Sequence, residues 1–229
     1  MDGVYVNGHG PYRFLVDTGT NVNLIETGLA RKIGMNATFK VDFASAAGKT
    51  QMSGSDDNEV TLDPAKADAQ KFFFSGLESI HNLNPDVQGV LGQWFLSRFD
   101  YSIDLRGKRL EFGKQERNGT RVKFAMLNGR MLVPSSLGNL VLDSGASRLV
   151  LFGVESDGGV DNRGRVRTLT GSQAIGTASR KLVIEARNIW RGDAVTMQSR
   201  TEPGVAGLLP LGLFKVTYVC NSEGYVIFE

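Results

Sequence analysis

Short apolar runs, separated by polar turns that contain glycine, make up most of the chain. VYV, NGHGP and YRFLV follow one another in residues 4–16, which predicts a β-hairpin, and MLVP, SSLGN and LVL repeat this order in residues 131–142. AQKFFFSGL in residues 69–77 predicts a buried strand, whereas the acidic run GSDDNEV in residues 54–60 predicts a solvated loop. Helical patterns are scarce, and ETGLARKIGM predicts a couple of turns that end near Gly34. The pattern therefore predicts an all-β protein.

The chain also contains an internal repeat. FLVDTGTNVNLI in residues 14–25 and NLVLDSGASRLVLF in residues 139–152 share an apolar run, an Asp-Thr/Ser-Gly tripeptide and a second apolar run. Each half then ends in a similar block, GVLGQWFLSRFDYSIDLRGKRLEF in residues 89–112 and GLLPLGLFKVTYVCNSEGYVIFE in residues 207–229. One tripeptide is a weak signal, but two copies followed by matching blocks are specific.

The repeated aspartates, Asp17 and Asp143, raise a question of charge. Each comes directly after a strand-like apolar run and before a second one, so each is expected on a short loop within a sheet. A buried carboxylate is costly unless its charge is shared or satisfied. Two such groups brought together can share one proton, so that only one of the two buried carboxyl groups carries a charge.

With these two motifs, the chain resembles the aspartic proteases over nearly its whole length. The signature is an apolar run with Asp-Thr/Ser-Gly, followed downstream by two apolar residues and glycine, as in VLG at residues 90–92. The resemblance implies two pseudo-symmetric, retropepsin-like β-barrel lobes, residues 1–113 and 119–229, with an active-site cleft between them. The linker is expected within GKQERNGT, residues 113–120, and the N-terminus of the first lobe is expected to be trimmed.

The resemblance also implies the catalytic machinery. Asp17 and Asp143 are expected to act as general acid and base on a water molecule held between them; aspartic protease dyads are the standard example of two carboxyl groups that cannot both ionise. The neighbouring residues are expected to support the site: Thr18, Gly19, Thr20, Ser144, Gly145 and Ala146. Since Thr20 has a hydroxyl and Ala146 has none, we expect Asp17 to be the charged member and Asp143 the protonated one.

Two hairpin candidates lie between the signature blocks. VDFASAAGKTQMSG, residues 41–54, and VRTLTGSQAIG, residues 166–176, each contain a central glycine. In the family such hairpins are flaps that pair with an extended substrate, and the residues expected to contact it are Ala47, Gly48, Lys49, Thr170, Gly171 and Ser172. Ordinary surface hairpins are an open alternative, because glycine turns are common.

Two departures from the family pattern affect the expected cleft. Pro210 stands in the second half where the first has Gly92, so the loop behind Asp143 has one hydrogen-bond donor fewer. Neither flap candidate contains a tyrosine, so a pepsin-like flap tyrosine is not expected.

Composition narrows the remaining choices. The 229 residues are 41% hydrophobic and 22% charged, with a net charge of +2, which suits one or two globular domains and offers no basic stripe for nucleic acid. No apolar stretch reaches membrane-spanning length, no metal-ligand motif occurs, and no cofactor is expected. The single cysteine, Cys220, is expected to be a buried hydrophobe. It is the resemblance to aspartic proteases, and not the composition, that implies an extracytoplasmic location, periplasmic or secreted, with any leader absent from this chain.

The sequence thus predicts a monomeric aspartic endopeptidase that cleaves extended or unfolded peptide. Two alternatives stay open: a catalytically silent peptide-binding module on the same fold, and a structural dimer in which each half pairs with a partner chain. A costly pair of carboxylates argues against the first alternative, and the presence of both half-sites in one chain argues against the second.

Overall fold

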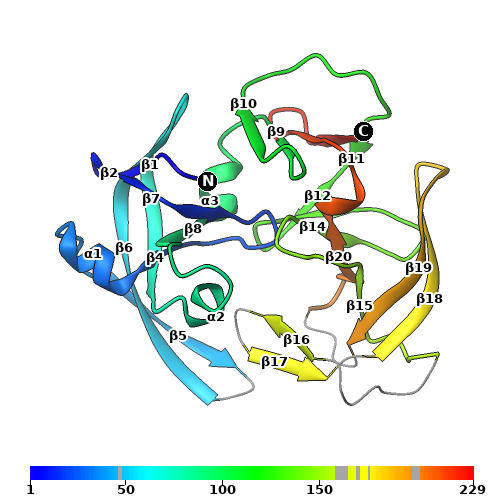
Figure 1. Ribbon diagram of the computed structural model, residues 1–229, viewed down its shortest axis with the longest axis horizontal. Coiled ribbons are helices and arrows are strands. Elements are labelled where there is room, and N and C mark those ends of the chain that lie inside the picture. The colour runs from blue at the N-terminus through cyan, green and yellow to red at the C-terminus, as the bar shows by residue number, and fades with distance from the viewer. Residues whose placement is uncertain (46–47, 158–164, 169–170, 175, 198–201) are drawn as a thin grey trace. The chain divides into compact units, whose positions relative to one another are not determined.

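The computed structural model describes residues 1–45, 48–157, 165–168, 171–174, 176–197 and 202–229. The chain divides into two compact units, Met1–Arg98 and Phe99–Glu229, and strands dominate both (Figure 1). The all-β prediction is confirmed: in the described part of the chain the longest helix is α1, Thr27–Lys32. That helix lies where the sequence predicted it, and Glu26 is its N-cap.

Unit 1 is built around a single sheet. The strand order is β2-β1-β6-β7-β4-β8-β3, and β5 pairs with the outer part of β6. The strands and short helices are β1 (Val4–Val6), β2 (His9–Tyr12), β3 (Phe14–Val16), β4 (Asn23–Glu26), β5 (Phe39–Ser45), β6 (Gly48–Leu62), β7 (Ala65–Ser75), β8 (Gly89–Leu91), α1, α2 (Glu78–His81) and α3 (Gln93–Leu96).

Unit 2 contains a seven-stranded sheet, β12-β13-β14-β20-β15-β19-β18, a five-stranded sheet, β10-β9-β21-β22-β11, and the pair β16-β17. Its elements are β9 (Tyr101–Asp104), β10 (Arg109–Phe112), β11 (Val122–Lys123), β12 (Ala125–Leu127), β13 (Arg130–Val133), β14 (Leu140–Asp143), β15 (Val150–Phe152), β16 (Arg165–Thr168), β17 (Gly171–Ala174), β18 (Gly176–Ile184), β19 (Arg187–Met197), β20 (Gly207–Pro210), the 3-10 helix η1 (Leu211–Leu213), β21 (Thr217–Cys220) and β22 (Tyr225–Phe228).

The two units share one arrangement of strands. In unit 1, β8 lies between β3, to which it is parallel, and β4, to which it is antiparallel. In unit 2, β20 lies in the same way between β14 and β15. In unit 1 the loop between β3 and β4 carries Asp17, and in unit 2 the loop between β14 and β15 directly follows Asp143. Each central strand therefore holds both ends of an aspartate loop.

Each unit has its own apolar core. In unit 1, Trp94 stacks on Phe73 with ring centroids 5.7 Å apart, and both pack with Leu24, Leu77 and Val90. In unit 2 one apolar cluster, formed mainly by strands of the seven-stranded sheet, consists of Leu132, Val141, Val150, Phe152, Val195, Met197 and Val205. Because burying such a side chain contributes about 1.5–3 kcal/mol, these clusters fix the strands that carry the aspartate loops.

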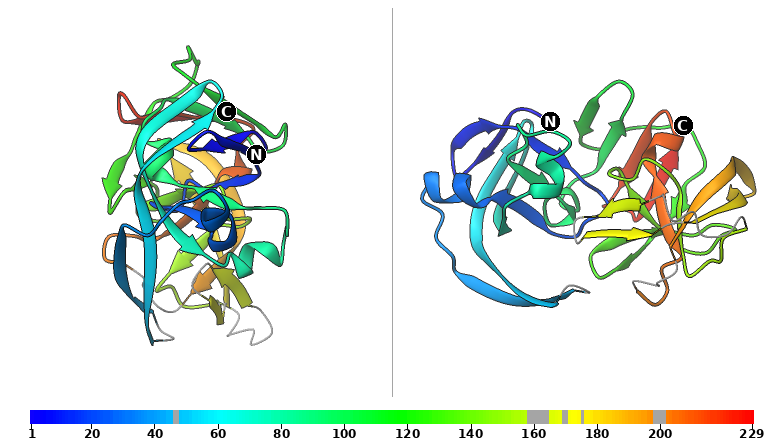
Figure 2. Two further views of the ribbon diagram at one scale, coloured as in Figure 1. Left: turned by 90° about the vertical axis from the view of Figure 1, so that its left-hand side faces the viewer. Right: turned by 60° about the horizontal axis from the view of Figure 1, so that its bottom comes forward.

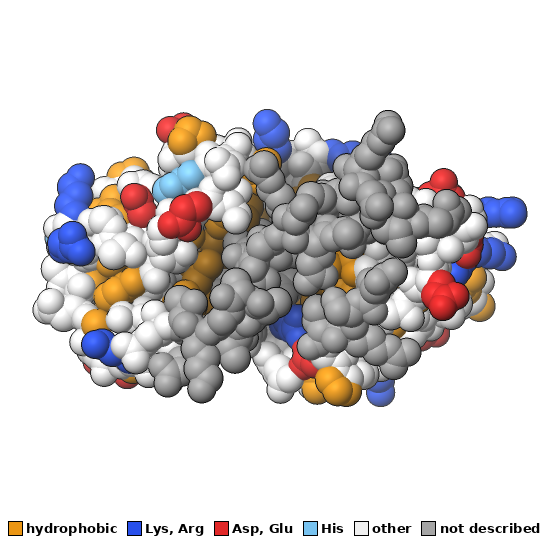
Figure 3. Space-filling model, turned by 90° about the horizontal axis from the view of Figure 1, so that it is seen from below, with side chains coloured by type: hydrophobic (Ala, Val, Ile, Leu, Met, Phe, Trp, Pro, Cys, Tyr) orange, Lys and Arg blue, Asp and Glu red, His pale blue; other side chains and the backbone are white. Residues whose placement is uncertain are grey.

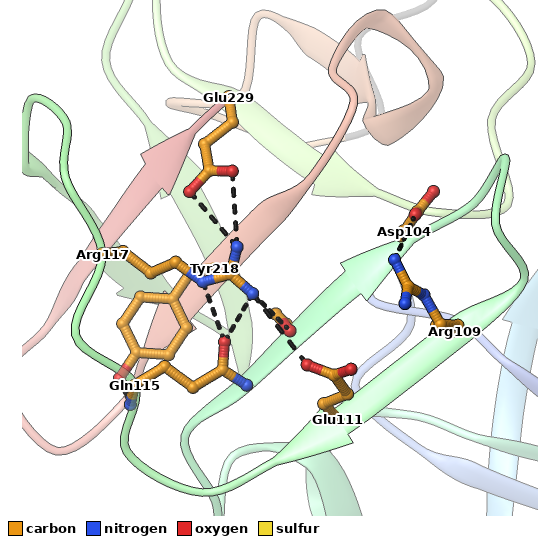
Figure 4. A network of polar contacts seen from close by, with 8 residues as sticks. Asp104, Arg109, Glu111, Gln115, Arg117, Tyr218 and Glu229 are labelled. Carbon is orange, nitrogen blue, oxygen red and sulfur yellow. Dashed lines mark hydrogen bonds and ion pairs between the residues drawn. The ribbon is translucent and has the colours of Figure 1, made fainter.

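The segment around the expected linker belongs to the second unit. β9 pairs with β21, and Arg117 donates to both carboxylate oxygens of Glu229 at 3.3 Å and to Gln115 Oε1 at 3.0 and 2.8 Å (Figure 4). The second compact unit begins at Phe99 and includes residues 113–120. The hairpin β9–β10 belongs to this unit because β9 pairs with β21. The lobe bounds, residues 1–113 and 119–229, stay a prediction.

The acidic run at residues 54–60 corrects one prediction. It lies in the long strand β6 and is not a loop (Figure 2). The pairing of β6 with β7 shifts register between Ser55 and Asn58, and Asp57 has a φ of 60°. This bulge lets the strand continue while the buried Asn58 side chain donates to the carbonyl of Gln70 at 3.1 Å.

Two surface features bear on partners. On the face drawn in Figure 3, lysine and arginine side chains lie interspersed with aspartate and glutamate side chains. Within the described ranges, no helix combines the length and the apolar character that a membrane crossing requires.

The central strand of unit 2 gives a stability prediction. A Cβ at Gly207 would collide with the carbonyl oxygen of Val150 and would come within 3.1 Å of the Cα of Leu151. We expect Gly207→Ala to lower the free energy of unfolding by about 1–3 kcal/mol, measured by chemical denaturation, because backbone atoms on the neighbouring strand have to move. Gly212→Ala is the matched control, since a Cβ there meets no atom within 4 Å. Equal stability of the two variants would contradict the packing argument.

Candidate active site

Asp17 lies at the carboxyl end of β3, where the chain leaves the sheet. Its backbone N–H donates to the carbonyl of Leu91 on β8 at 3.0 Å, and Gly19 N–H donates to Asp17 Oδ1 at 2.9 Å. Thr18, the next residue, is fully buried. The predicted residues Asp17, Thr18, Gly19 and Thr20 thus form one loop, in which the carboxylate receives a backbone donor.

Asp143 is the last residue of β14 and has two backbone donors. Gly145 N–H and Ala146 N–H donate to Asp143 Oδ1 at 2.7 and 2.9 Å. Ser144 lies in the bend between Asp143 and Gly145. The predicted residues Asp143 to Ala146 therefore form the loop of unit 2 that corresponds to the loop of Asp17 in unit 1. Hydrogen bonds of this kind favour the ionised carboxylate.

The charge of Asp143 is set by opposing effects. Burial raises the pKa of the Asp143 carboxyl above its ordinary value, against the opposing effects of the two N–H groups and of the Arg130 cation. The antiparallel register of β13 and β14, which pairs Leu132 with Val141, brings Arg130 toward the Asp143 end of β14. In the balance of these effects, burial outweighs the donors.

Arg130 is itself anchored. Its Nη2 forms an ion pair with Glu202, and Glu202 also accepts a hydrogen bond from the side-chain amide of Asn128. The side chains of Arg130 and Glu202 are 24% and 15% exposed, so solvent screens the pair only in part. Sequence reasoning missed Arg130; the available signal was an arginine at the start of the strand that pairs with the aspartate strand.

Two further residues that sequence reasoning missed support the Asp17 loop and the strand next to it through hydrogen bonds. Gln93 donates from Nε2 to the carbonyl of Thr18 at 2.9 Å, and its backbone N–H donates to the carbonyl of Thr20 at 3.0 Å. Asn23 Oδ1 accepts the N–H of Gly92 at 3.0 Å. Both side chains are buried. The signals available in the sequence were a glutamine directly after VLG and an asparagine within the apolar run that follows Asp17-Thr-Gly.

The flap candidates occupy hairpins. β5 pairs with β6 up to Ser45 opposite Gly48, and β16 pairs with β17 up to Thr168 opposite Gly171. Gly48 and Lys49 begin β6, and Gly171 and Ser172 begin β17. Ala47 and Thr170 lie outside the described residues. For all six flap candidates, contact with a substrate stays a prediction.

Comparison with models of protein families gives a match to the first unit. Residues 3–95 match a family model described as aspartyl protease, and the matched region contains the Asp17 loop and the three strands that hold it. No curated protein matches the chain. The match supports a relationship of the first unit to aspartyl proteases, and with it a relationship to hydrolases that act on peptide bonds.

The raised pKa of Asp143 predicts a dependence of stability on pH. Since the folded protein holds this proton more tightly than the unfolded chain, the free energy of unfolding falls as pH rises from the ordinary carboxyl pKa of about 3.9 through the raised pKa. An asparagine side chain at this position would keep an oxygen for both N–H donors and would not ionise. We expect Asp143→Asn to melt a few degrees higher than the wild type at neutral pH, with no difference below about pH 3.9.

The control for this measurement has the opposite sign. The N–H of Gly107 lowers the pKa of Asp104, so Asp104 stabilises the fold above its ordinary pKa. Asp104→Asn should melt lower than the wild type at neutral pH. A melting temperature of Asp143→Asn at or below that of the wild type across the whole pH range would contradict the assignment.

Proposed function

We propose that the protein is an aspartic endopeptidase in which Asp17 and Asp143 act as a pair. The observation that carries the proposal is the shared strand arrangement: an Asp-Thr/Ser-Gly loop follows β3 and β14 in the same register against a central strand, with Val16 opposite Leu91 and Leu142 opposite Leu209. The aspartyl protease match to residues 3–95 supports the same assignment for the first unit.

The proposed chemistry uses one proton shared by two carboxyl groups. The charged aspartate takes a proton from a water molecule, whose oxygen attacks the peptide carbonyl carbon. The protonated aspartate donates to the carbonyl oxygen as it becomes tetrahedral. When this intermediate collapses, the first aspartate gives the proton it took from water to the leaving amine, and the hydroxyl returns its proton to the second aspartate. The raised pKa of Asp143 supports its role as the protonated member. The stabilising role of the Thr20 hydroxyl for a charged Asp17 stays a prediction.

The proposed substrate is an extended or unfolded segment of polypeptide. The hairpins β5–β6 and β16–β17 offer strand edges that could pair with such a segment, one from each unit, as in a two-flapped retropepsin. We propose that the two lobes act within one monomer. The alternative is a silent peptide-binding module, which would bind the same segment and leave it intact.

The test of the proposal is proteolysis of denatured casein from acidic to neutral pH, with and without a pepstatin-type inhibitor. We expect the inhibitor to suppress cleavage, and Asp17→Asn and Asp143→Asn each to lower the rate at least about 10²-fold, since general acid–base catalysis contributes about 10²–10⁴-fold. Asp86→Asn is the control, because Asp86 is an exposed carboxylate paired with Arg13 at the surface. Binding of casein without cleavage would favour the silent module.

Arg130 offers a second test through the pH–rate profile. Its cation lowers the pKa of Asp143, so Arg130→Met should raise that pKa further. If Asp143 is the general acid, the alkaline limb of kcat/KM moves to higher pH, because this limb reports the ionisation of the acid in the free enzyme. Arg130→Lys keeps the charge and should keep the limb near its wild-type position. A shift of the acidic limb alone would assign the proton to the other aspartate.

A further inference from the structure

We infer that Gln93 and Asn23 are positioning residues for the Asp17 loop. This inference rests on the proposed function, because the loop matters for catalysis only if Asp17 is a catalytic residue. It concerns how the backbone of the loop is held, and not a further contact with substrate.

The two side chains bind the loop and the strand behind it. Gln93 begins α3 directly after β8, and its Nε2 and backbone N–H reach the carbonyls of Thr18 and Thr20 at 2.9 and 3.0 Å. Both carbonyls flank Gly19, whose N–H donates to Asp17 Oδ1. Gln93 therefore fixes the peptide group between Thr18 and Gly19, whose N–H contacts the carboxylate, and the peptide group that follows Thr20.

Asn23 anchors the other side of the same support. Its Oδ1 accepts the N–H of Gly92, and its Nδ2 donates to Gln70 Oε1 at 3.2 Å and to the carbonyl of Lys71 at 3.1 Å. A Cβ at Gly92 would collide with the carbonyl of Val22, so this residue has to be glycine for the loop to pack so closely. The Asp17 loop thus stands on a buried polar network that continues into β7.

Unit 2 solves the same problem with apolar residues. The matched registers place Leu149 where unit 1 has Asn23, since Leu24 pairs with Val90 and Val150 pairs with Leu208. Pro210 replaces Gly92, and Leu211 replaces Gln93. Proline has no N–H and therefore needs no acceptor like that of asparagine, and the buried Leu149 is consistent with that. The substitutions belong together: where the donor is lost, its acceptor is lost as well.

The polar support in unit 1 has a cost that the apolar support avoids. Gln93 Oε1 is buried and has no hydrogen-bond partner among the residues that the structure describes. An unsatisfied buried acceptor costs about 1–3 kcal/mol. Leucine at this position, as in unit 2, would remove this unpaired oxygen and with it the donor to the carbonyl of Thr18. Gln93 is explained by the geometry that its amide N–H imposes on the carbonyl of Thr18.

Gln93→Met tests the inference in the full chain, with Gln70→Met as the matched control. Methionine keeps the length of the side chain and removes the amide oxygen and the amide NH2, so the lost hydrogen bond and the removed unpaired oxygen offset each other in stability. Gln70 is an equally buried amide of the same network that does not contact the loop. Kinetics are measured on an internally quenched peptide built around one casein cleavage site.

We expect Gln93→Met to lower kcat about 10- to 100-fold with KM within about twofold, because a displaced catalytic group can cost about 10²-fold in rate. Gln70→Met should keep kcat within about threefold and melt at a lower temperature, since the side chain of Asn23 loses one acceptor. A wild-type kcat in Gln93→Met, or an equal loss in Gln70→Met, overturns the positioning role.

Asn23 is tested in the same assay by a pair of variants. Asn23→Leu leaves the N–H of Gly92 without its acceptor, whereas Asn23→Asp retains one. We expect Asn23→Asp to keep at least about fivefold more of the wild-type kcat than Asn23→Leu at acidic pH, where the carboxyl is protonated and can also donate. Equal kcat in the two variants overturns the role of Asn23.

Amide hydrogen exchange separates this inference from the proposed function. We expect the N–H of Gly19 to exchange at least about tenfold faster in Gln93→Met than in the wild type and in Gln70→Met, because the peptide groups around it are released. If the wild-type protein cleaves no peptide, the proposed function fails, and the exchange rate alone decides whether Gln93 holds the loop. Unchanged exchange at Gly19 overturns the inference whatever the activity.

Discussion

The structure depends on the way in which a carboxylate is held at the end of a buried strand. Water is partly excluded from such a position, so the carboxylate would be destabilising unless the loop after the strand supplies backbone donors to it. Both units meet this requirement alike: the N–H two residues after the aspartate donates to its Oδ1, at 2.9 Å in unit 1 and 2.7 Å in unit 2. β8 and β20 each lie between the two strands that an aspartate loop connects. In this position each strand fixes both ends of its loop at once.

The two units differ in what lies beneath this shared arrangement. Unit 1 uses glycine, asparagine and glutamine, and so places the loop through directional hydrogen bonds. Unit 2 uses Pro210, Leu211 and Leu149, and so places it through packing. Hydrogen bonds define the orientation of a peptide group more narrowly than apolar contacts do, whereas apolar contacts bury no unpaired polar atom. Two units with the same strand arrangement can therefore differ in the residues that support the loop while the register of the strands stays the same.

Much of the fold could be predicted from the sequence, because it is encoded in local patterns. The hairpin β13–β14 before Asp143, the buried strand at Phe72–Phe74 and the helix at Thr27–Lys32 follow from the spacing of apolar residues and glycines. In unit 1 the hairpin is β1–β2, whereas β3, which leads to Asp17, pairs with β8. The acidic run at residues 54–60 was wrongly predicted as a loop because a bulge at Asp57 hides the strand pattern. The grouping of β9 and β10 with β21 depends on pairing between distant segments, which no local pattern reports.

The candidate site shows the same limit and points to its consequence. The aspartates and their small neighbours form a motif, so the sequence predicts them, but Arg130, Asn23 and Gln93 act through contacts made only when distant strands meet. These residues are also where the two halves differ. In a pair of carboxyl groups that share one proton, equal surroundings would leave the proton equally often on either group. In the proposed pair, a cation and packed leucines around Asp143, against buried amides around the Asp17 loop, would remove that equality. The residues hidden from sequence reasoning are then the ones that would decide which aspartate carries the charge.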